Sequence, residues 1–180
     1  MTIAFVTPAH RQVVVMGVSG CGKTTLGEAL AKAWDCEFVE GDRYHSPENV
    51  ARMAAGIALT DEWRRDWLLT LADMLGQAYA QQRSMVLSCS ALKRSYRDRL
   101  RAGDAQALFV HLEGSQSVIA ARIAQRTHLY MPASLLDSQF AALQPPEPDE
   151  QALSLSVQQP PADLIQNIAH HLQAQACPTP

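Results

Sequence analysis

Short apolar runs alternate along this chain with longer segments in which apolar residues recur every three or four positions. The runs are rich in valine, leucine and phenylalanine, which is typical of strands buried on both faces of a parallel sheet. The predicted strands are Gln12–Met16, Glu37–Glu40, Met85–Cys89, Ala107–Leu112 and Ala152–Val157. The alternation of strands with helical segments predicts an α/β fold built on a five-stranded parallel sheet.

The segments between these runs are predicted as helices. Thr60–Gln81 is typical, because Trp67, Leu71 and Leu75 form an apolar stripe at helical spacing and a threonine followed by acids caps the start. The whole chain, residues 1–180, is interpreted as one domain. Further helices are predicted from the residues after Gly22 to Trp34, over Ser46–Ala55, Ser115–Gln125, Ser134–Leu143 and Ala162–Gln175, and from near Lys93 onward.

Composition and charge narrow the class of protein. Hydrophobic residues make up 47% of the chain, as in an ordinary globular domain, and the formal net charge is −3. A weakly acidic chain without an apolar run of transmembrane length is expected to bind neither nucleic acid nor a membrane. The cysteines show no C-x-x-C spacing and the first residues lack an apolar secretory segment, so we expect free thiols and a cytoplasmic protein.

The segment Gly17–Thr24, GVSGCGKT, fits the Walker A pattern G-x-x-x-x-G-K-[ST] between a predicted strand and a predicted helix. Glycines let successive backbone N–H groups face a phosphate, the lysine reaches the β- and γ-phosphates, and Thr24 offers a hydroxyl to Mg²⁺. A dinucleotide-binding pattern is disfavoured because Thr25 replaces its third glycine. Cys21 is interpreted as a passive loop residue. The predicted nucleotide-binding residues are Gly17, Val18, Ser19, Gly20, Cys21, Gly22, Lys23, Thr24 and Thr25.

Two carboxylates at the end of the second predicted strand are candidates for chemistry. Ligands bind beyond the carboxyl ends of parallel strands, so Asp42 is expected near the phosphate loop. A phosphoryl acceptor needs its hydroxyl oriented and deprotonated, which makes Asp42 the candidate general base. Glu40 is either a carboxylate that acts through a Mg²⁺-bound water or an ordinary charge at a strand end.

Basic side chains are the candidates for binding an anionic acceptor. Arg52 and Arg64 lie in the segment of about 43–82, which commonly covers the acceptor in P-loop kinases. Lys93 and Arg97 are predicted to share one helix face at the end of the third strand, a placement that suits a substrate carboxylate or phosphate.

Other charged residues of this helix are interpreted as ordinary surface charges. We expect Arg101 to be solvated and Arg94 to pair with Asp98.

A second pair of arginines follows the fourth predicted strand. Arg122 and Arg126 are four residues apart at a helix end, and we predict that they reach over a triphosphate from a small lid of about 122–138. They are candidate catalytic residues, with Lys23 and Asp42, because their charge offsets that of a transferred phosphoryl group. The loop Gln158–Pro161, beyond the fifth strand, is predicted to hold the adenine ring.

Several ordered blocks resemble the gluconate kinase family of small P-loop kinases. Besides the phosphate loop, Glu40–Leu59 follows the family's GD-x-x-H-x-x-x-N-x-x-K/R-M-x-x-G-x-x-L pattern. CSALKRSYRDRLR at Cys89–Arg101 matches the CSALK-x-x-YRD-x-LR block. LLDSQFAAL at Leu135–Leu143, with Pro146, Asp149 and Glu150, matches the last block. The resemblance spans roughly Val13–Ile168, most of the chain.

The resemblance implies a three-layer α/β/α P-loop nucleoside-kinase-like fold and ATP-dependent phosphorylation of D-gluconate to 6-phospho-D-gluconate. ATP and Mg²⁺ are the implied cofactors, and a cytosolic homodimer is the implied assembly. Asp42 would act as general base on the gluconate hydroxyl. The residues implied to line the acceptor site are His45, Arg52, Arg64 and Lys93.

Other functions stay open at this point. A P-loop kinase for another hydroxy acid, such as shikimate, would share the fold. A GTPase-like switch would need an N-K-x-D motif and a D-x-x-G motif after the second strand, and the sequence has neither there. A catalytically silent ATP-binding scaffold would keep the Walker A loop, and the departure from the family pattern at Leu129, in the predicted lid, leaves room for it.

Overall fold

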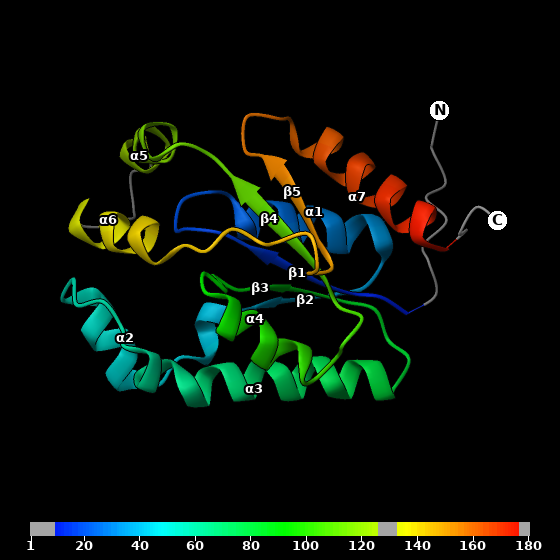
Figure 1. Ribbon diagram of the computed structural model, residues 1–180, viewed down its shortest axis with the longest axis horizontal. Coiled ribbons are helices and arrows are strands. Elements are labelled where there is room, and N and C mark those ends of the chain that lie inside the picture. Colours follow the sequence, from blue (N-terminus) through cyan, green and yellow to red (C-terminus); the bar gives the residue numbers. More distant parts are fainter. Residues whose placement is uncertain (1–9, 126–132, 177–180) are drawn as a thin grey trace.

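A five-stranded parallel sheet forms the centre of the computed structural model, which describes residues 10–125 and 133–176 (Figure 1). The spatial order is β2-β3-β1-β4-β5, and every neighbouring pair is parallel. On β1, Val14 lies between Leu87 of β3 and Phe109 of β4. The predicted five-stranded parallel sheet is thereby confirmed. The strands are β1 (Gln12–Met16), β2 (Glu37–Glu40), β3 (Met85–Ser88), β4 (Leu108–Glu113) and β5 (Ala152–Ser156).

The helices begin where the sequence places capping residues. The Thr60 side chain accepts a hydrogen bond from the Trp63 N–H at 3.3 Å, and Ser46 does the same for the Asn49 N–H at 3.2 Å. These caps fix the starts of α3 and α2. The helices are α1 (Lys23–Trp34), the 3₁₀ turn η1 (Gly41–Tyr44), α2 (Pro47–Ala54), α3 (Asp61–Ala80), α4 (Arg94–Arg101), α5 (Gln116–Ala124), α6 (Ala133–Ala142) and α7 (Pro161–Ala176).

Helices cover both faces of the sheet, with α1 and α7 on one side and α3 and α4 on the other (Figure 1). Strand β1 shows how one sequence serves both faces. Val13 and Val15 belong to the core cluster that includes Leu30 of α1, whereas Val14 and Met16 belong to the cluster that includes α3 residues. All four side chains are fully buried, as expected for a central strand. The three-layer α/β/α arrangement is therefore confirmed.

The loops that follow β1 and β3 begin at the same edge of the sheet and then run to opposite faces. Helix α1 follows β1 on one face, and α4 follows the neighbouring strand β3 on the other face. The Gly17 N–H donates to the Ser90 carbonyl at 3.2 Å, so the two departing loops are joined at their start. Such a divergence point is where open α/β sheets bind ligands.

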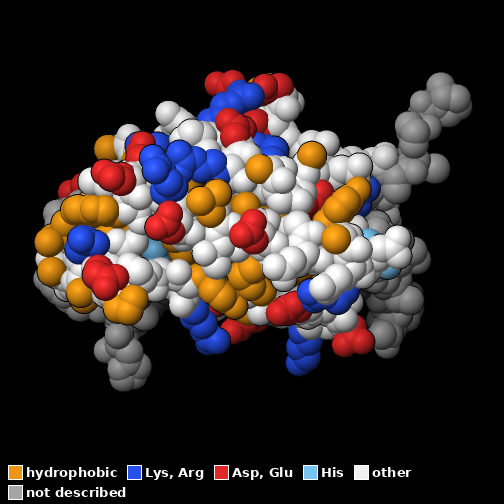
Figure 2. Space-filling view, turned by 90° about the horizontal axis from the view of Figure 1, so that it is seen from below, with side chains coloured by type: hydrophobic (Ala, Val, Ile, Leu, Met, Phe, Trp, Pro, Cys, Tyr) orange, Lys and Arg blue, Asp and Glu red, His pale blue; other side chains and the backbone are white. Residues whose placement is uncertain are grey.

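The outer face of the α2–α3 layer carries exposed hydrophobic side chains between charged ones, as Figure 2 shows from below. Val50 of α2, and Leu69 and Tyr79 of α3, are each about half exposed. Among the described residues, no helix combines the length and the apolar character needed to span a membrane.

The loop after α4 packs directly on the backbone of α3. A Cβ built on Gly103 would lie 1.9 Å from the Ala72 carbonyl oxygen and 3.1 Å from the Gly76 nitrogen. A side chain at this position therefore has no room unless the two helices separate.

We expect Gly103→Ala to lower the free energy of unfolding by about 2–3 kcal/mol, because the clash is with backbone rather than with a flexible side chain. Urea denaturation measures the change. Ala105→Ser, an equally small addition at an exposed position of the same loop, should change stability by less than about 0.5 kcal/mol. Equal stabilities of Gly103→Ala and the wild type would contradict this account of the α3–α4 packing.

Candidate active site

The phosphate loop has the backbone that the Walker A pattern predicts. Gly17, Gly20 and Gly22 have φ angles of 137°, 82° and 105°, values that side chains with a Cβ rarely adopt. Gly22 is the N-cap of α1 and offers no side chain, so none caps the first N–H groups of this helix. Free N–H groups and the positive end of the helix dipole form a binding site for phosphate. Cys21 is buried beside Gly17, consistent with a passive packing role.

Lys23 folds back over the loop. Its Nζ donates to the carbonyl oxygens of Gly17 at 3.2 Å and Val18 at 3.1 Å. A neutral carbonyl oxygen is a weaker acceptor for the ammonium group than a negatively charged phosphate oxygen, because hydrogen bonds between ionised groups are the stronger ones. The ammonium group is thus held next to the loop and free to exchange these carbonyls for phosphate.

Glu40 connects three elements at the edge of the sheet. The Thr24 hydroxyl donates to Glu40 Oε2 at 2.6 Å, and the Ser88 hydroxyl donates to Glu40 Oε1. The end of β2 is thereby tied to the first turn of α1 and to the end of β3. These contacts give Glu40 a bridging position at the end of β2, and a role through a Mg²⁺-bound water stays a prediction.

The donor set around Thr24 suits Mg²⁺. A hydroxyl and a carboxylate are oxygen ligands, and Mg²⁺ in phosphate sites takes its remaining ligands from phosphates and water. No group of three or more His, Cys, Asp or Glu side chains within residues 10–125 and 133–176 could hold a metal ion on its own. Thr24 and, through water, Glu40 fit a Mg²⁺ ion that arrives with the nucleotide.

The backbone at Asp42 is positioned by contacts of its neighbour Gly41. The Trp67 indole N–H donates to the Gly41 carbonyl at 2.8 Å, and a Cβ on Gly41 would lie 2.2 Å from the Ser88 carbonyl oxygen. The turn is thus pressed against β3. The Asp42 side chain is 64% exposed at the same edge of the sheet as the phosphate loop. A solvent-facing carboxylate on a fixed backbone is available to an acceptor hydroxyl.

His45 lies beneath Asp42. Its ring stacks on Trp67 with centroids 4.1 Å apart, and its Nε2 is 4.0 Å from Asp42 Oδ1. Burial lowers the pKa of His45, against the opposing charge of Asp42, so the imidazole is neutral at pH 7. The structure places it as a support for the η1 turn, and a direct contact with substrate stays a prediction.

Two of the predicted acceptor-binding cations lie over one aromatic ring. Arg64 Cζ is 5.9 Å and Lys93 Nζ 5.6 Å from the ring centroid of Tyr96 on α4. Asp61 accepts hydrogen bonds from Lys93 Nζ at 2.6 Å and from the Tyr96 hydroxyl. The Lys93 bond lowers the pKa of Asp61, and Asp61 in turn raises the pKa of Lys93. A positive cluster with one internal counter-charge therefore lies on the α3–α4 side.

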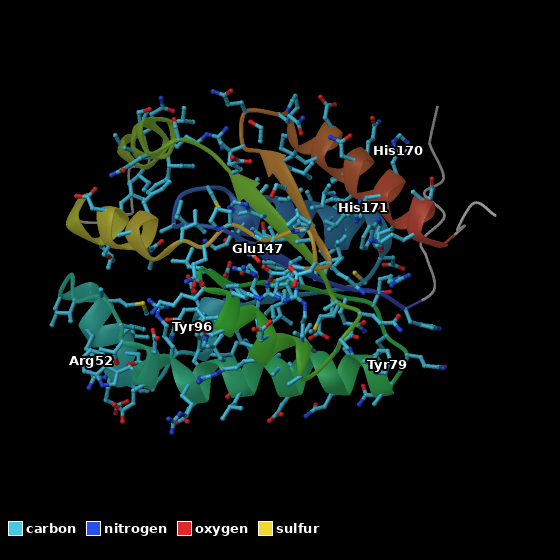
Figure 3. All side chains as sticks on the ribbon, viewed as in Figure 1. Arg52, Tyr79, Tyr96, Glu147, His170 and His171 are labelled. Atoms are coloured by element: carbon cyan, nitrogen blue, oxygen red, sulfur yellow. The ribbon has the colours of Figure 1, made fainter. Side chains whose placement is uncertain are left out.

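Arg52 has different partners. Its guanidinium lies 4.1 Å from the ring centroid of Trp63, and Nη1 donates to Asn49 Oδ1 at 3.0 Å. Figure 3 shows Arg52 on α2 and Tyr96 on α4, both on the side of the sheet that α3 covers. The structure thus groups Arg64 with Lys93 and leaves Arg52 with a separate aromatic partner.

The prediction that Arg97 binds substrate is wrong. Its side chain is fully buried, with Nε and Nη2 donating to the Glu150 carboxylate at 2.6 and 2.7 Å. Its Nη1 donates to the carbonyl oxygens of Ala91, Leu92 and Gln144. Lys93 and Arg97 do not share a helix face, because Lys93 precedes α4 with an extended backbone. Arg97 holds the turn that carries Lys93 instead.

Two expectations about neighbouring arginines also fail. Arg101 is largely buried, donates to Glu150 at 3.1 Å and covers the ring of Phe109 at 4.4 Å. Arg94 pairs with two acids of the loop after α6 rather than with a residue on its own helix. Three of the α4 arginines thus pair with acids of that loop, which sequence spacing within α4 does not reveal. The arginines are Arg94, Arg97 and Arg101, and the acids are Glu147, Asp149 and Glu150.

A cavity of about 370 Å³ joins the phosphate loop to the segment after β5. Gly20 and Thr25 line one side, and Gln159 and Pro161 line the other, where the adenine ring is predicted. Arg122 also lines this cavity, and its Nη2 donates to the Val157 carbonyl.

Part of the predicted lid lies outside the described residues. Arg126 and Leu129 are among the residues not described, so the lid roles of Arg122 and Arg126 stay predictions.

Comparison with known proteins decides the family. A gluconokinase of Gluconobacter oxydans (strain 621H) is 43% identical over 165 residues, which cover 92% of this chain and 93% of that protein. A family model described as an AAA domain matches residues 13–146. The chain belongs to the gluconokinase family.

Solved structures agree with the gluconokinase assignment. A gluconokinase from Sinorhizobium meliloti 1021 superposes with a TM-score of 0.83 at 42% identity, covering 94% of this chain and 95% of that one. A sugar kinase from Janibacter sp. HTCC2649 gives 0.86 at 48% identity, covering 92% and 95%. A shikimate kinase from Aquifex aeolicus, at 14% identity and 0.61 with coverage of 93% and 99%, shares the fold alone.

Within this gluconokinase framework, sequence reasoning missed three site residues. Trp67 was interpreted as core, and its indole N–H also holds the η1 turn. Glu150 and Gln139 belong to the last family block, yet their contacts with Arg97 and Ser19 span 53 and 120 residues. Only the match to that block signalled that these positions matter.

The Arg97–Glu150 pair gives a pH-dependent prediction. Glu150→Ala should lower the free energy of unfolding at pH 7 by about 3–5 kcal/mol, because it leaves buried arginines unpaired. Arg97 lowers the pKa of Glu150 to about 2. The stability gained from this lowered pKa is therefore complete above the ordinary carboxyl pKa and is lost as the pH falls from there toward about 2. Urea unfolding of both proteins between about pH 7 and pH 3 should show the difference shrinking in acid.

The control is Glu147→Ala, which removes an exposed carboxylate of the same loop. It should cost less than about 1 kcal/mol. A Glu150→Ala penalty that matches this control, or that grows in acid, would contradict the role assigned to the buried pair.

Proposed function

We propose that the protein transfers the γ-phosphoryl group of ATP to the 6-hydroxyl of D-gluconate, which yields 6-phospho-D-gluconate and ADP. The observation that carries the proposal is the hydrogen bond from Thr24 to Glu40, which holds the end of β2, and with it Asp42, against the phosphate loop. Membership of the gluconokinase family supports D-gluconate as the acceptor.

The nucleotide phosphates bind the N–H groups of Gly17–Thr24 in this proposal. Lys23 releases the Gly17 and Val18 carbonyls and bonds to phosphate oxygens, which are stronger acceptors for an ammonium group. Bound Mg²⁺ supplies positive charge to the β- and γ-phosphates. Thr24 would hold the ion directly and Glu40 through water.

Asp42 is the proposed general base. Its exposed carboxylate accepts the proton of the gluconate 6-hydroxyl while that oxygen forms a bond to the γ-phosphorus. The bond from the γ-phosphorus to the β–γ bridging oxygen breaks, and ADP leaves with that oxygen. Lys23, Arg122 and Arg126 offset charge on the transferred group.

The gluconate carboxylate is proposed to bind at Lys93 and Arg64. Both cations lie over Tyr96, and Asp61 balances only one of their two charges. An added carboxylate neutralises the other. Arg52 and the buried His45 complete the proposed acceptor site from the segment of about 43–82.

We also propose a single domain over residues 1–180, a lid of about 122–138, a cytosolic location and a homodimeric assembly. The last two rest on the resemblance of the sequence to its family. The alternative, a kinase for another hydroxy acid such as shikimate, is less well supported because the shikimate kinase likeness extends only to the fold.

Coupled measurement of ADP release tests the proposed acceptor. With ATP and Mg²⁺, D-gluconate should give a kcat/KM at least about 100-fold higher than shikimate or other aldonates, because a site built for particular hydroxyls leaves buried polar groups unpaired with the wrong one. Turnover of shikimate alone would refute the acceptor. A protein that binds ATP and turns over nothing would be the silent scaffold.

Asp42→Asn tests the base. It should lower kcat with D-gluconate about 10²- to 10⁴-fold with little change in KM for ATP, because it removes proton transfer and preserves shape. Asp73→Asn is the matched control, since Asp73 is an exposed carboxylate on the outer part of α3. Wild-type turnover in Asp42→Asn would rule out the base assignment.

A further inference from the structure

Helix α4 begins at a residue that cannot cap it. Lys93 is the N-cap, and its side chain makes no capping hydrogen bond, because an ammonium group only donates. The first N–H groups of a helix have no partner within the helix, and a serine, threonine, aspartate or asparagine usually accepts from one of them. An acceptor for the Arg94 N–H, the first of α4, therefore has to come from another part of the chain.

Gln144, in the loop after α6, supplies that acceptor. Its Oε1 accepts from the Arg94 N–H at 2.8 Å, a contact that spans 50 residues. Its backbone N–H donates to the Leu92 carbonyl at 2.8 Å, and its carbonyl accepts from Arg97 Nη1 at 2.9 Å. Leu92 and Arg94 are the two neighbours of Lys93. Gln144 thus holds the backbone on both sides of Lys93, and it holds the Arg94 side through its side chain.

The turn before α4 has a backbone that needs such support. Ala91 has a φ of 43°, in the left-handed region that residues with a Cβ rarely adopt. It is fully buried, and its carbonyl accepts from Arg97 Nη1 at 3.2 Å. A conformation of this kind persists only where surrounding contacts hold it. The hydrogen bonds from Arg97 and Gln144 supply such contacts, and the turn can relax when one of them is lost.

The position of the Lys93 ammonium group depends on this turn. The turn gives Lys93 an extended backbone, with φ −98° and ψ 148°. From there its Nζ reaches Asp61, the first residue of α3, at 2.6 Å and lies 5.6 Å from the ring centroid of Tyr96. A change in the backbone moves the ammonium group, because the side chain starts from it. The groups that hold Leu92 and Arg94 therefore also place this cation.

We propose that Gln144 is a positioning residue for the acceptor: its side chain caps α4 in place of residue 93, which leaves Lys93 to bind the acceptor carboxylate. The inference rests on the proposed function in taking Lys93 as a ligand of the gluconate carboxylate. A conventional cap at position 93 would satisfy the start of the helix but would remove the cation. Asp42 and the phosphate loop belong to other elements, so the effect of Gln144 falls on acceptor binding.

Gln144→Met tests the proposal, because it removes the acceptor oxygen, keeps the length of the side chain and leaves the backbone hydrogen bonds in place. It should raise KM for D-gluconate about fivefold, since the backbone at Lys93 loses one of its two supports. Both kcat and KM for ATP should change less than about twofold. Gln144→Glu retains an oxygen, and a negative charge is favourable at a helix N-terminus, so its KM should stay within about twofold of the wild-type value. Coupled measurement of ADP release gives these constants.

Titration of Asp61 tests the same position without any acceptor. The hydrogen bond from Lys93 lowers the pKa of Asp61, so displacement of Lys93 should let that pKa rise toward its ordinary value. Carbon-13 NMR of the Asp61 carboxyl group should show the rise in Gln144→Met and not in Gln144→Glu. The matched control is Gln166→Met, which changes an exposed glutamine of α7 on the other face of the sheet (Figure 1). It should leave the pKa of Asp61 and the KM for D-gluconate unchanged.

An equal rise in KM in Gln144→Met and Gln144→Glu, or an unchanged pKa of Asp61 in Gln144→Met, would overturn the proposal. Thermal melting should show all three variants folded. A wild type that does not phosphorylate D-gluconate would refute the proposed acceptor, and the titration of Asp61 would still decide whether Gln144 positions Lys93. Failure of the proposed function is thus distinguishable from failure of this inference.

Discussion

The bridging carboxylate of Glu40 is the interaction on which the arrangement of the site depends. It accepts from Thr24 at the start of α1 and from Ser88 at the end of β3, and it belongs to β2 itself. Parallel strands end at one edge of the sheet, but the edge alone does not fix where each loop goes. Glu40 joins the segments that follow β1, β2 and β3. Asp42 lies two residues after Glu40, so its backbone is positioned by the same contacts.

The proposed acceptor side depends on a buried ion pair. Arg97 and Glu150 satisfy each other and also hold the carbonyls of the turn before Lys93. Taking both charges from water is costly, so the pair is weak support for stability as such. Its contribution is positional, because it fixes the backbone from which Lys93 reaches Asp61 and Tyr96. Lys93 thus lies partly exposed, and the ion pair that supports its turn is buried.

Local patterns made the strands, the helix caps and the phosphate loop predictable, because each depends on residues close in sequence. The apolar runs matched the sheet, and Thr60 capped α3 as expected. The role of Arg97 was not predictable, because its partner lies 53 residues away and Lys93 is not helical. The contact of Gln139 with Ser19 depends on how α6 packs, which no local pattern encodes.

The position of the phosphate on the product tests the account most directly, because it depends on the substrate, the base and the phosphate loop together. Phosphorus NMR of the reaction of ATP with D-gluconate should show a new phosphate ester coupled to the two protons of C6, with ADP formed in equal amount. Phosphate on a secondary hydroxyl, or inorganic phosphate as the only product beside ADP, would contradict the proposed placement of Asp42 beside the γ-phosphate.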